Sequence, residues 1–354
     1  MNITESFNGK TLVITGGTGS FGSTVLKHFL TSKIGEIRII SRDEKKQDMM
    51  RHMLQADNHE YASKVRFYVG NVRNIDSVRE VMCGANYVFH AAALKEVPSC
   101  EFFPMEAVRT NIVGTDNVIT ASVENRVERV VFLSTDKAAY PINSMGMTKA
   151  VGEKIVAARA QNAFERGGTI LASTRYGNVM CSRGSVIPLF IDQIKNKRPI
   201  TITDPNMTRF LMNLDEAVDL VAFAFENAEP GDLFIQKADA SAIGDLADGV
   251  MKVFGKTEKK IIGTRHGEKL YETLMTREER LRSTDMGNYF KITPDGRSLN
   301  YDKFYVEGNV LTEGEEAYTS HNTNRLDVDG VVAKIMTTDY VKEELEGRPH
   351  MVEA

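Results

Sequence analysis

Short apolar runs alternate with longer amphipathic stretches through the first half of the chain. Six runs have the length and β-branched content of strands: KTLVIT (10–15), EIRIIS (36–41), VRFYVG (65–70), ANYVFHAAA (85–93), RVVFLST (129–135) and TILASTRYG (169–177). The stretches between them space their apolar residues with the period of a helix, for example at 22–32, 75–84 and 105–125. Strands that alternate with helices form βαβ units, so the pattern predicts an α/β fold with a doubly wound parallel sheet.

The pattern changes after about residue 177. Helices are predicted at 185–196, 214–227 and 242–255, and strands at 199–204 and 231–236. The stretch 276–325 is charged, rich in Gly and Asp and only weakly periodic, and 329–354 is expected to form a terminal helix with a loose end. A smaller C-terminal lobe on the carboxyl ends of the sheet would fit this pattern.

The boundary between the two parts is expected to be discontinuous, because the helix 214–227 could return to the first part. We predict that residues 1–177 and about 212–237 form the larger domain. Residues of about 178–211 and 238–354 are predicted to form the smaller lobe, which would bind substrate.

The composition argues against several kinds of partner. The 354 residues carry a formal net charge of -4, which gives no basic footprint for nucleic acid or anionic lipid. Three scattered cysteines (Cys83, Cys100, Cys181) and seven histidines without a close pair predict no metal site. No signal-like segment is found, and no apolar run approaches the ~18 residues that span a bilayer. The sequence therefore predicts a soluble, cytoplasmic protein.

A glycine-rich turn follows the first predicted strand. The run TLVITGGTGSFGSTVL places Gly16, Gly17, Gly19 and Gly22 between that strand and the next helix. Glycines there permit a tight turn and let the backbone approach a pyrophosphate, while the helix N-terminus directs free N–H groups at the anion. Although such a motif alone could be an ordinary turn, its place in the first βα turn predicts a Rossmann-type dinucleotide site.

The residues after the second predicted strand bear on the choice of cofactor. An acidic residue there favours NAD, whereas an arginine favours the 2′-phosphate of NADP. The run Ser41-Arg42-Asp43 offers both, followed by two lysines, and Arg42 comes first. We therefore predict NADP as the cofactor, with NAD as the alternative. The same charged residues could also be a solvent-exposed cluster at the start of the next helix. Asn71, at the end of the third strand, is placed to meet the adenine or to cap a turn.

Four segments in order, GGTGSFG, HAAALK, STDK and RYGNV, resemble the extended short-chain dehydrogenase/reductase family. Longer segments resemble bacterial UDP-N-acetylglucosamine 4,6-dehydratases that invert C5 of the sugar. Such enzymes act in capsule and O-antigen synthesis, and the segments are shared with those on the N-acetyl-L-fucosamine pathway. These segments are SRDEKKQ, HAAALKEVPSCEF, PINSMG, SRGSVIPLF, TITDPNMTRF, GTRHGEKLYE and SHNT. The resemblance extends from the glycine loop to about residue 328.

The resemblance implies a nicotinamide cofactor that is tightly bound and recycled. It also implies a homo-oligomer, either a dimer or a hexamer. The residues expected to contact the cofactor are Gly16, Thr18, Gly19, Ser20, Phe21, Gly22, Ser41, Arg42, Asp43, Asn71, Val72, Ala91, Ala92, Ala93, Lys95, Asn111, Lys149, Tyr176 and Asn178.

Asp136 and Lys137 follow the fifth predicted strand, at the sheet edge where such folds bind ligands. As in related dehydratases, the resemblance implies that Asp136 is the acid toward the C6 oxygen and Lys137 the base at C5. Burial is expected to lower the pKa of Lys137 toward neutral pH, as a base requires. The alternative is an exposed turn with an incidental charge pair.

Lys149 follows Met145 by four positions, so the two share one face of a helix. The resemblance implies that Lys149 binds the nicotinamide ribose and holds positive charge near the C4 oxygen. It also places Met145 where the family usually has its catalytic tyrosine. A thioether cannot exchange protons, so another group must take the proton from the C4 hydroxyl.

Three acceptors are open for that proton: Lys137, Asp136 or a water molecule, and we rank Lys137 first. Tyr140 is a phenol in the same loop. Pro141 follows it, which favours an extended Tyr140 directed away from the helix.

A UDP-sugar brings two phosphates, which call for cations and amide donors. The resemblance implies that Arg183 and Arg265 face the pyrophosphate and that Glu268 meets the uridine ribose. The SHNT run (320–323) is expected to close over the site, although helix capping would explain Ser320 or Thr323 equally well. The full predicted set is Lys95, Asn178, Ser182, Arg183, Arg209, Arg265, Glu268 and His321.

The predicted function is a UDP-N-acetylglucosamine 4,6-dehydratase with C5 inversion. Its product would be a UDP-2-acetamido-2,6-dideoxy-hexos-4-ulose for polysaccharide synthesis. The alternative is a UDP-glucose or UDP-N-acetylglucosamine 4-epimerase, which has no need of the Asp136–Lys137 pair. A third hypothesis, an NADP-binding regulatory protein, does not explain why Asp136, Lys137 and Lys149 are all present.

Overall fold

The computed structural model describes all residues except 1–4, 58, 183, 265–266, 295–315 and 348–354. Its centre is a nine-stranded sheet, in the spatial order β13 (Ser283–Asp285), β14 (Tyr289–Ile292), β9 (Leu233–Gln236), β6 (Ile170–Arg175), β5 (Arg129–Leu133), β4 (Tyr87–His90), β1 (Thr11–Thr15), β2 (Glu36–Ser41) and β3 (Val65–Val69). The strands from β9 to β3 are parallel, β14 is antiparallel to β9, and β13 is antiparallel to β14. The order β3-β2-β1-β4-β5-β6 is that of a doubly wound dinucleotide-binding sheet, so the predicted fold class is confirmed.

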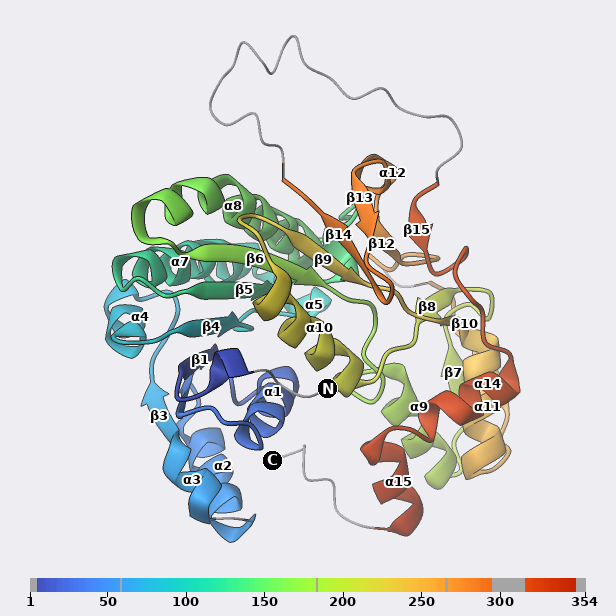
Figure 1. The fold of residues 1–354 in the computed structure, drawn as a ribbon. Coiled ribbons are helices and arrows are strands. Elements are labelled where there is room, and N and C mark those ends of the chain that lie inside the picture. The colour runs from blue at the N-terminus through green and yellow to red at the C-terminus, as the bar shows by residue number, and fades with distance from the viewer. Residues whose placement is uncertain (1–4, 58, 183, 265–266, 295–315, 348–354) are drawn as a thin grey trace.

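Side-chain alternation along β1 separates two apolar cores. Leu12 and Ile14 lie in one core, and Val13 between them lies in the other. The first core is covered by α1 (Ser20–Leu30), α2 (Glu44–Asp57) and α10 (Leu214–Asn227), and the second by α4 (Ile75–Met82), α7 (Gly114–Glu124) and α8 (Ser144–Gly167). Figure 1 shows helices on both faces of the sheet. Burial on both faces explains why the strands read as nearly continuous apolar runs.

The chain leaves this sheet after β6 and later returns to it. Strand β9 pairs with β6, and α10 packs against α1. Strands β13 and β14 then extend the sheet beyond β9. The prediction had assigned their segment to the smaller lobe, which is wrong for these two strands. They are short edge strands with charged residues, so their periodicity was too weak to detect.

The smaller lobe has a separate apolar core. It is formed by α9 (Val186–Lys195), β7 (Ile200–Ile202), α11 (Ile243–Phe254), α14 (Val328–Ile335) and α15 (Asp339–Glu346). The strand β11 (Lys259–Ile261) pairs with β7, and β8 (Thr208–Phe210) pairs with β10 (Ala240–Ala242). The single terminal helix expected from residue 329 is two helices. The Thr338 hydroxyl accepts the N–H of Val341 and caps the second one.

Several short elements connect these layers. The η3 turn, which directly follows β5, is important for the site because it carries Asp136 and Lys137. The elements are η1 (Glu5–Phe7), α3 (His59–Lys64), α5 (Val97–Phe102), α6 (Pro104–Ala107), the π-helical η2 (Val108–Val113), η3 (Asp136–Ala138), β12 (Thr273–Met275), α12 (Arg277–Arg280) and β15 (Tyr318–Thr319).

A buried arginine connects the sheet to the segment that follows the lobe. The Arg175 guanidinium, at the end of β6, donates to Glu153 of α8 (Nε to Oε1, 3.0 Å) and to Glu279 of α12 (Nη1 to Oε2, 2.8 Å). It also donates to the Leu274 carbonyl oxygen at 2.9 Å. These contacts fix the residues around β12 against the sheet.

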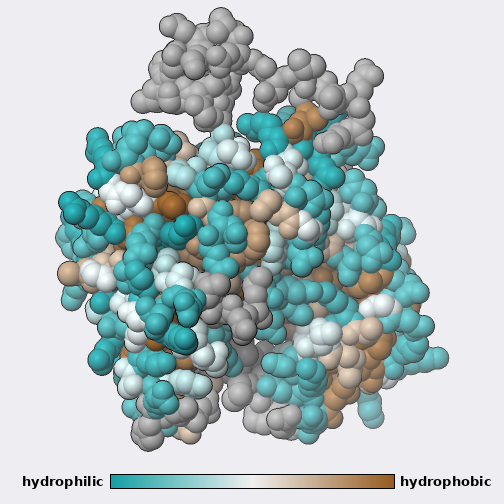
Figure 2. Space-filling view, in the orientation of Figure 1, coloured by the Kyte–Doolittle hydropathy of each residue, from teal (hydrophilic) through white to brown (hydrophobic). Residues whose placement is uncertain are grey.

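The face of the molecule seen in Figure 2 is mostly hydrophilic, with apolar side chains scattered among polar ones. Scattered exposed apolar residues are ordinary for a folded protein. Within the described ranges, no helix is long and apolar enough to cross a membrane.

Candidate active site

A cavity of about 1280 Å³ opens at the carboxyl ends of the parallel strands. The glycine loop and the strand ends line one side of it, and residues of α9, β7, β8 and α11 line the other. Such folds bind ligands at this edge. The predicted residues that line the cavity are Gly16, Thr18, Gly19, Ser20, Phe21, Gly22, Ser41, Arg42, Asp43, Asn71, Val72, Ala91, Ala92, Ala93, Lys95, Lys137, Met145, Lys149, Tyr176, Asn178, Ser182, Arg209 and Glu268.

The glycine loop lies close against the backbone after β4. Gly16 has φ +69°, and a side chain there would come within 2.9 Å of the Ala92 backbone. Helix α1 starts at Ser20, and no side chain caps it. Its first N–H groups therefore remain available to an anion in the cavity.

The charged residues after β2 have different roles. The Asp43 carboxylate accepts the Lys46 N–H at 3.0 Å and so caps α2. Arg42 is exposed at the cavity and makes no hydrogen bond or ion pair with any residue that the structure describes. The Asn71 side chain accepts the Arg73 N–H at 3.1 Å, which is the turn-capping role considered for it, although Asn71 also lines the cavity.

Asp136 is completely buried at the start of η3 and, unlike Lys137, is not among the residues that line the cavity. Its Oδ1 accepts the Thr135 hydroxyl at 2.7 Å and the Lys137 ammonium at 3.0 Å. Its Oδ2 is buried without a hydrogen-bond partner. The alternative of an exposed turn with an incidental charge pair is therefore wrong.

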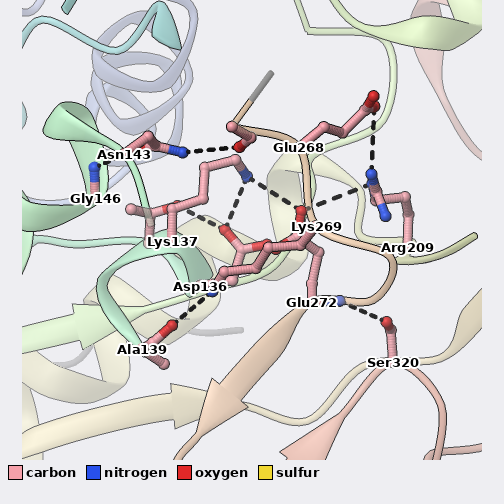
Figure 3. A network of polar contacts seen from close by, with 12 residues as sticks. Asp136, Lys137, Ala139, Asn143, Gly146, Arg209, Glu268, Lys269, Glu272 and Ser320 are labelled. Carbon is pink, nitrogen blue, oxygen red and sulfur yellow. Dashed lines mark hydrogen bonds and ion pairs between the residues drawn. The ribbon is translucent and has the colours of Figure 1, made fainter. Parts of the chain in front are cut away.

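Lys137 extends from η3 into the cavity wall with 25% of its side chain exposed. Its Nζ is 3.0 Å from Asp136 Oδ1 and 3.9 Å from Glu272 Oε1 (Figure 3). Burial lowers the pKa of Lys137, but the charges of Asp136 and Glu272 outweigh it, and the net shift is upward. The predicted lowering is wrong because the sequence did not reveal the second carboxylate.

A set of charged residues from the lobe and from the segment before β12 surrounds this pair (Figure 3). Arg209 on β8 has its Nη2 3.4 Å from Glu268 Oε1 and its Nε 3.6 Å from Glu272 Oε1. Lys269 donates to the Ala139 carbonyl oxygen at 2.7 Å. Glu272, Lys269 and Thr135 were not predicted. Thr135 adjoins Asp136, but no sequence signal distinguishes Glu272 from the exposed charges around it.

The start of α8 is held against η3. The Gly146 Cα lies so close to the Lys137 carbonyl oxygen that a side chain at Gly146 would collide with it. The Asn143 side chain accepts the Gly146 N–H at 2.9 Å and donates to the Gly267 carbonyl oxygen at 3.2 Å. Asn143 thus joins α8 to the segment that carries Glu268 (Figure 3).

Met145 and Lys149 both reach the cavity from α8. Met145 is buried and packs with Cys100 and Ala107. The Lys149 ammonium donates to the Leu133 carbonyl oxygen at 2.5 Å and lies 4.4 Å from the centre of the Phe132 ring. Burial lowers the pKa of Lys149 to about 8.

Some predicted residues are placed differently. Asn111 is buried and does not line the cavity; its amide pairs with the backbone of Leu94 and with Thr148, so it positions the wall. His321 is also absent from the lining, and its exposed ring packs against Tyr271. Arg183 and Arg265 lie outside the described residues.

The SHNT run does not cap a helix. The Ser320 hydroxyl pairs with Thr208 on β8, and the Thr323 hydroxyl donates to the Ala238 carbonyl oxygen at 2.9 Å. Ser320 also accepts the Glu272 N–H at 2.9 Å. This run therefore holds the segments that carry Arg209 and Glu272.

Tyr140 is not extended as expected, since its φ is +46°. Its hydroxyl donates to the Glu278 carboxylate at 2.9 Å and accepts the Arg277 N–H at 3.2 Å. These contacts outweigh the preference that Pro141 imposes. The Tyr140 hydroxyl is thus hydrogen-bonded to residues of α12, and Tyr140 does not line the cavity.

The described residues contain no group of three or more His, Cys, Asp or Glu side chains that could hold a metal ion.

The strand order, the uncapped helix after the glycine loop and the cavity at the strand ends define a protein of the extended short-chain dehydrogenase/reductase type. The chain belongs to the polysaccharide biosynthesis protein family, whose sequence model matches residues 12–294. The C-terminal domain described for polysaccharide biosynthesis proteins matches residues 295–342. The predicted family resemblance is thereby confirmed.

Similar proteins carry different names. A UDP-glucose 4-epimerase from Rickettsia felis is 54% identical over 345 residues, covering 96% of this chain and 99% of the relative. The solved structure of Pen from Bacillus thuringiensis is 35% identical with a TM-score of 0.83, covering 94% of this chain and 99% of that one. A dTDP-glucose 4,6-dehydratase from Streptomyces venezuelae, solved with NAD bound, is similar in fold alone, at 17% identity, 95% and 98% coverage and a TM-score of 0.67.

The buried Lys149 should make stability depend on pH. Its pKa is about 8 in the folded protein and near 10.4 when unfolded, so its charge opposes folding most below pH 8, and this penalty disappears as the pH rises toward 10.4. We expect Lys149→Met to have a larger free energy of unfolding than wild type. This gain should be about 2 kcal/mol greater at pH 7 than at pH 10. Urea unfolding at both pH values measures this. The control is Lys154→Met, since Lys154 is exposed on the same helix. The difference in free energy of unfolding between this variant and wild type should be the same at both pH values. If the free-energy difference between Lys149→Met and wild type were the same at pH 7 and pH 10, the lowered pKa of Lys149 would be contradicted.

Proposed function

We propose that this protein is a UDP-N-acetylglucosamine 4,6-dehydratase that inverts C5. The observation that carries the proposal is the hydrogen bond between Lys137, which lines the cavity, and Asp136, which is buried beside it. The second carboxylate oxygen of Asp136 has no partner among the described residues. Elimination of water across C5 and C6 needs a base for the C5 proton and an acid for the C6 oxygen. Oxidation or 4-epimerisation alone needs neither group.

A nicotinamide cofactor fits the cavity residues. Gly16 leaves room only for backbone, and the uncapped start of α1 offers N–H donors for a pyrophosphate. When bound there, such a cofactor would supply the hydride transfer that links C4 and C6 of the sugar. The exposed guanidinium of Arg42 is suited to a 2′-phosphate, and Asp43 is already engaged as a helix cap, so we propose NADP rather than NAD.

Lys137 and Asp136 act as a unit in this proposal. Transfer of one proton from Lys137 Nζ to Asp136 Oδ1, along their 3.0 Å hydrogen bond, leaves a neutral amine and a protonated carboxyl. Lys137 then removes the C5 proton, while Asp136 protonates the departing C6 oxygen. Lys149 keeps positive charge beside the C4 oxygen. The raised pKa of Lys137 describes the resting pair before this transfer.

The UDP part is assigned to the opposite side of the cavity. Ser182, Arg209 and Glu268 line it there, and Lys95 lines it after β4. The Asn178 Oδ1 is buried without a partner at the same wall, which leaves it available to a sugar hydroxyl. Arg183 and Arg265 remain predicted pyrophosphate contacts.

A second candidate function is a UDP-glucose 4-epimerase. It is favoured by the name of the Rickettsia felis relative at 54% identity. An epimerase also needs a proton acceptor at the C4 hydroxyl, and Met145 cannot serve as one. Both candidates therefore assign that task to Lys137, and they differ in what happens at C5 and C6.

Incubation of the purified protein with UDP-N-acetylglucosamine in D₂O separates the two. We expect a 6-deoxy-4-keto product with deuterium at C5 and inverted C5 configuration, because the C5 proton exchanges with solvent. NMR and mass spectrometry measure the product, and added NADP should not be consumed. A 4-epimer without deuterium would contradict the dehydratase and support the epimerase.

Arg42→Ala should weaken NADP much more than NAD. A charge-assisted contact to the 2′-phosphate contributes about 1.5–3 kcal/mol, so its removal should cost at least about tenfold in NADP affinity. Calorimetric titration with both cofactors measures this. The control is Lys45→Ala, since Lys45 is exposed on the same segment but does not line the cavity. An equal loss for both cofactors would remove Arg42 from the site.

Lys137→Met should lose about 10² to 10⁴ in turnover, because a positioned base contributes that much. Met145→Leu should keep most of its turnover, since the thioether exchanges no proton and the swap costs less than about 1.5 kcal/mol in packing. Steady-state kinetics on both folded variants check this. If Lys137→Met were as active as wild type, the base would have to be another group.

A further inference from the structure

Glu272 is a buried carboxylate that the proposed reaction has not used. It directly precedes β12, only 3% of the residue is exposed, and it does not line the cavity. Its N–H donates to the Ser320 hydroxyl at 2.9 Å, and Ser320 in turn pairs with Thr208 at 2.7 Å. The backbone is thus fixed to β8, so the side chain can move only about its own bonds.

The carboxyl group of Glu272 has two long ion pairs but accepts no hydrogen bond from any described residue. Its Oε1 lies 3.9 Å from Lys137 Nζ and 3.6 Å from Arg209 Nε, both beyond hydrogen-bond distance. Its Oε2 is buried and has no partner within the described chain. A buried carboxylate oxygen without a donor is unfavourable, and a proton on that oxygen relieves the penalty.

The charged groups around Glu272 come from three elements. Asp136 and Lys137 face it from η3, Arg209 faces it from β8, and Lys269 adjoins it in its own segment. Burial and then the charge of Asp136 raise the pKa of Glu272, against the opposing effect of the cations. Glu272 therefore binds a proton more readily than an exposed glutamate does.

Met145 makes such a group necessary. With no phenol at that position, Lys137 is assigned two protons in succession, first from the C4 hydroxyl and then from C5. A single amine can do this only if it passes on the first proton before it receives the second. Among the described residues, the carboxyl groups within 4.0 Å of its Nζ are those of Asp136 and Glu272. Asp136 must stay protonated for the C6 oxygen, which leaves Glu272.

We propose that Glu272 accepts from Lys137 the proton that Lys137 takes from the C4 hydroxyl, so that the same amine is free to remove the C5 proton. One N–H bond on Lys137 breaks and one O–H bond on Glu272 forms, with no change in oxidation state. The proton then passes to Asp136 and replaces the one lost with the departing water. The transfer requires closure of the 3.9 Å gap, which commonly happens when substrate binds. Glu272 is a positioning residue, since it acts through Lys137, and the proposal rests on the dehydratase function.

Infrared spectroscopy of the free protein tests the proton affinity of Glu272 without any reaction. We expect the carbonyl stretch of a protonated carboxyl group to persist at pH 5.5, well above the ordinary glutamate pKa of about 4.3. The band should be lost in Glu272→Gln, which keeps the shape of the side chain but cannot exchange a proton. It should remain in the control Glu278→Gln, an exposed carboxylate bonded to Tyr140. Absence of the band from wild type, or a band in Glu272→Gln as intense as in wild type, would overturn the proposal.

Kinetics test the transfer itself, on whichever UDP-sugar conversion the D₂O experiment reveals. We expect Glu272→Gln to lower kcat at least about tenfold with little change in KM, because the residue lies outside the cavity lining. Glu272→Asp retains a carboxyl group and should recover part of that loss, while Glu278→Gln should match wild type.

Wild-type kcat in a folded Glu272→Gln would overturn the proposal. So would a Glu272→Asp variant that is folded yet no more active than Glu272→Gln, because the role would then be one of shape. If wild type yields only a 4-epimer, the dehydratase function fails by that result alone, and the infrared titration still decides whether Glu272 holds a proton.

Discussion

The carboxylate of Asp136 is buried with one oxygen paired to Lys137 and the other unpaired, and the surrounding site is arranged around it. A buried charge is tolerated only beside an opposite charge, so the ammonium of Lys137 must stay within hydrogen-bond distance. That requirement fixes η3 at the end of β5. It also explains why the first turn of α8 carries Gly146 against the Lys137 carbonyl oxygen, since a larger residue would push the helix away. Met145 and Lys149 reach the cavity because of this close contact.

The charges around the pair have opposite effects on their neighbours. The second carboxylate, Glu272, helps to raise the pKa of Lys137, and Asp136 raises that of Glu272. Lys149 makes no ion pair within the described ranges, and burial lowers its pKa against the weaker effect of the Glu153 charge. Two lysines in one cavity are therefore tuned in opposite directions. In the proposed reaction, this difference suits Lys137 for proton exchange within a carboxyl cluster, while Lys149, with a pKa of about 8, still carries its positive charge at neutral pH.

The names of similar proteins do not decide the reaction. The fold is shared by proteins named as epimerases and as dehydratases. A fold positions a cofactor and a sugar, but the side chains at the sugar carbons determine which bond breaks. We propose that in this protein those side chains are Asp136 and Lys137, and that Lys137 also takes the C4 hydroxyl proton because Met145 cannot.

The sequence alone determined the βα alternation, the glycine loop and the strand-end position of Asp136 and Lys137. These features depend on local periodicity and on the rule that parallel strands place their carboxyl ends at one edge. Only the tertiary structure decided the edge strands β13 and β14, the backbone of Tyr140, the wall position of Asn111 and the direction of the Lys137 pKa shift. Each of these depends on residues far apart in the chain. Glu272 is the clearest case: it lies 135 positions beyond Lys137, and in sequence it is one charged residue among many. Packing of β12 beside η3 is what makes it buried, close to the amine and able to hold a proton.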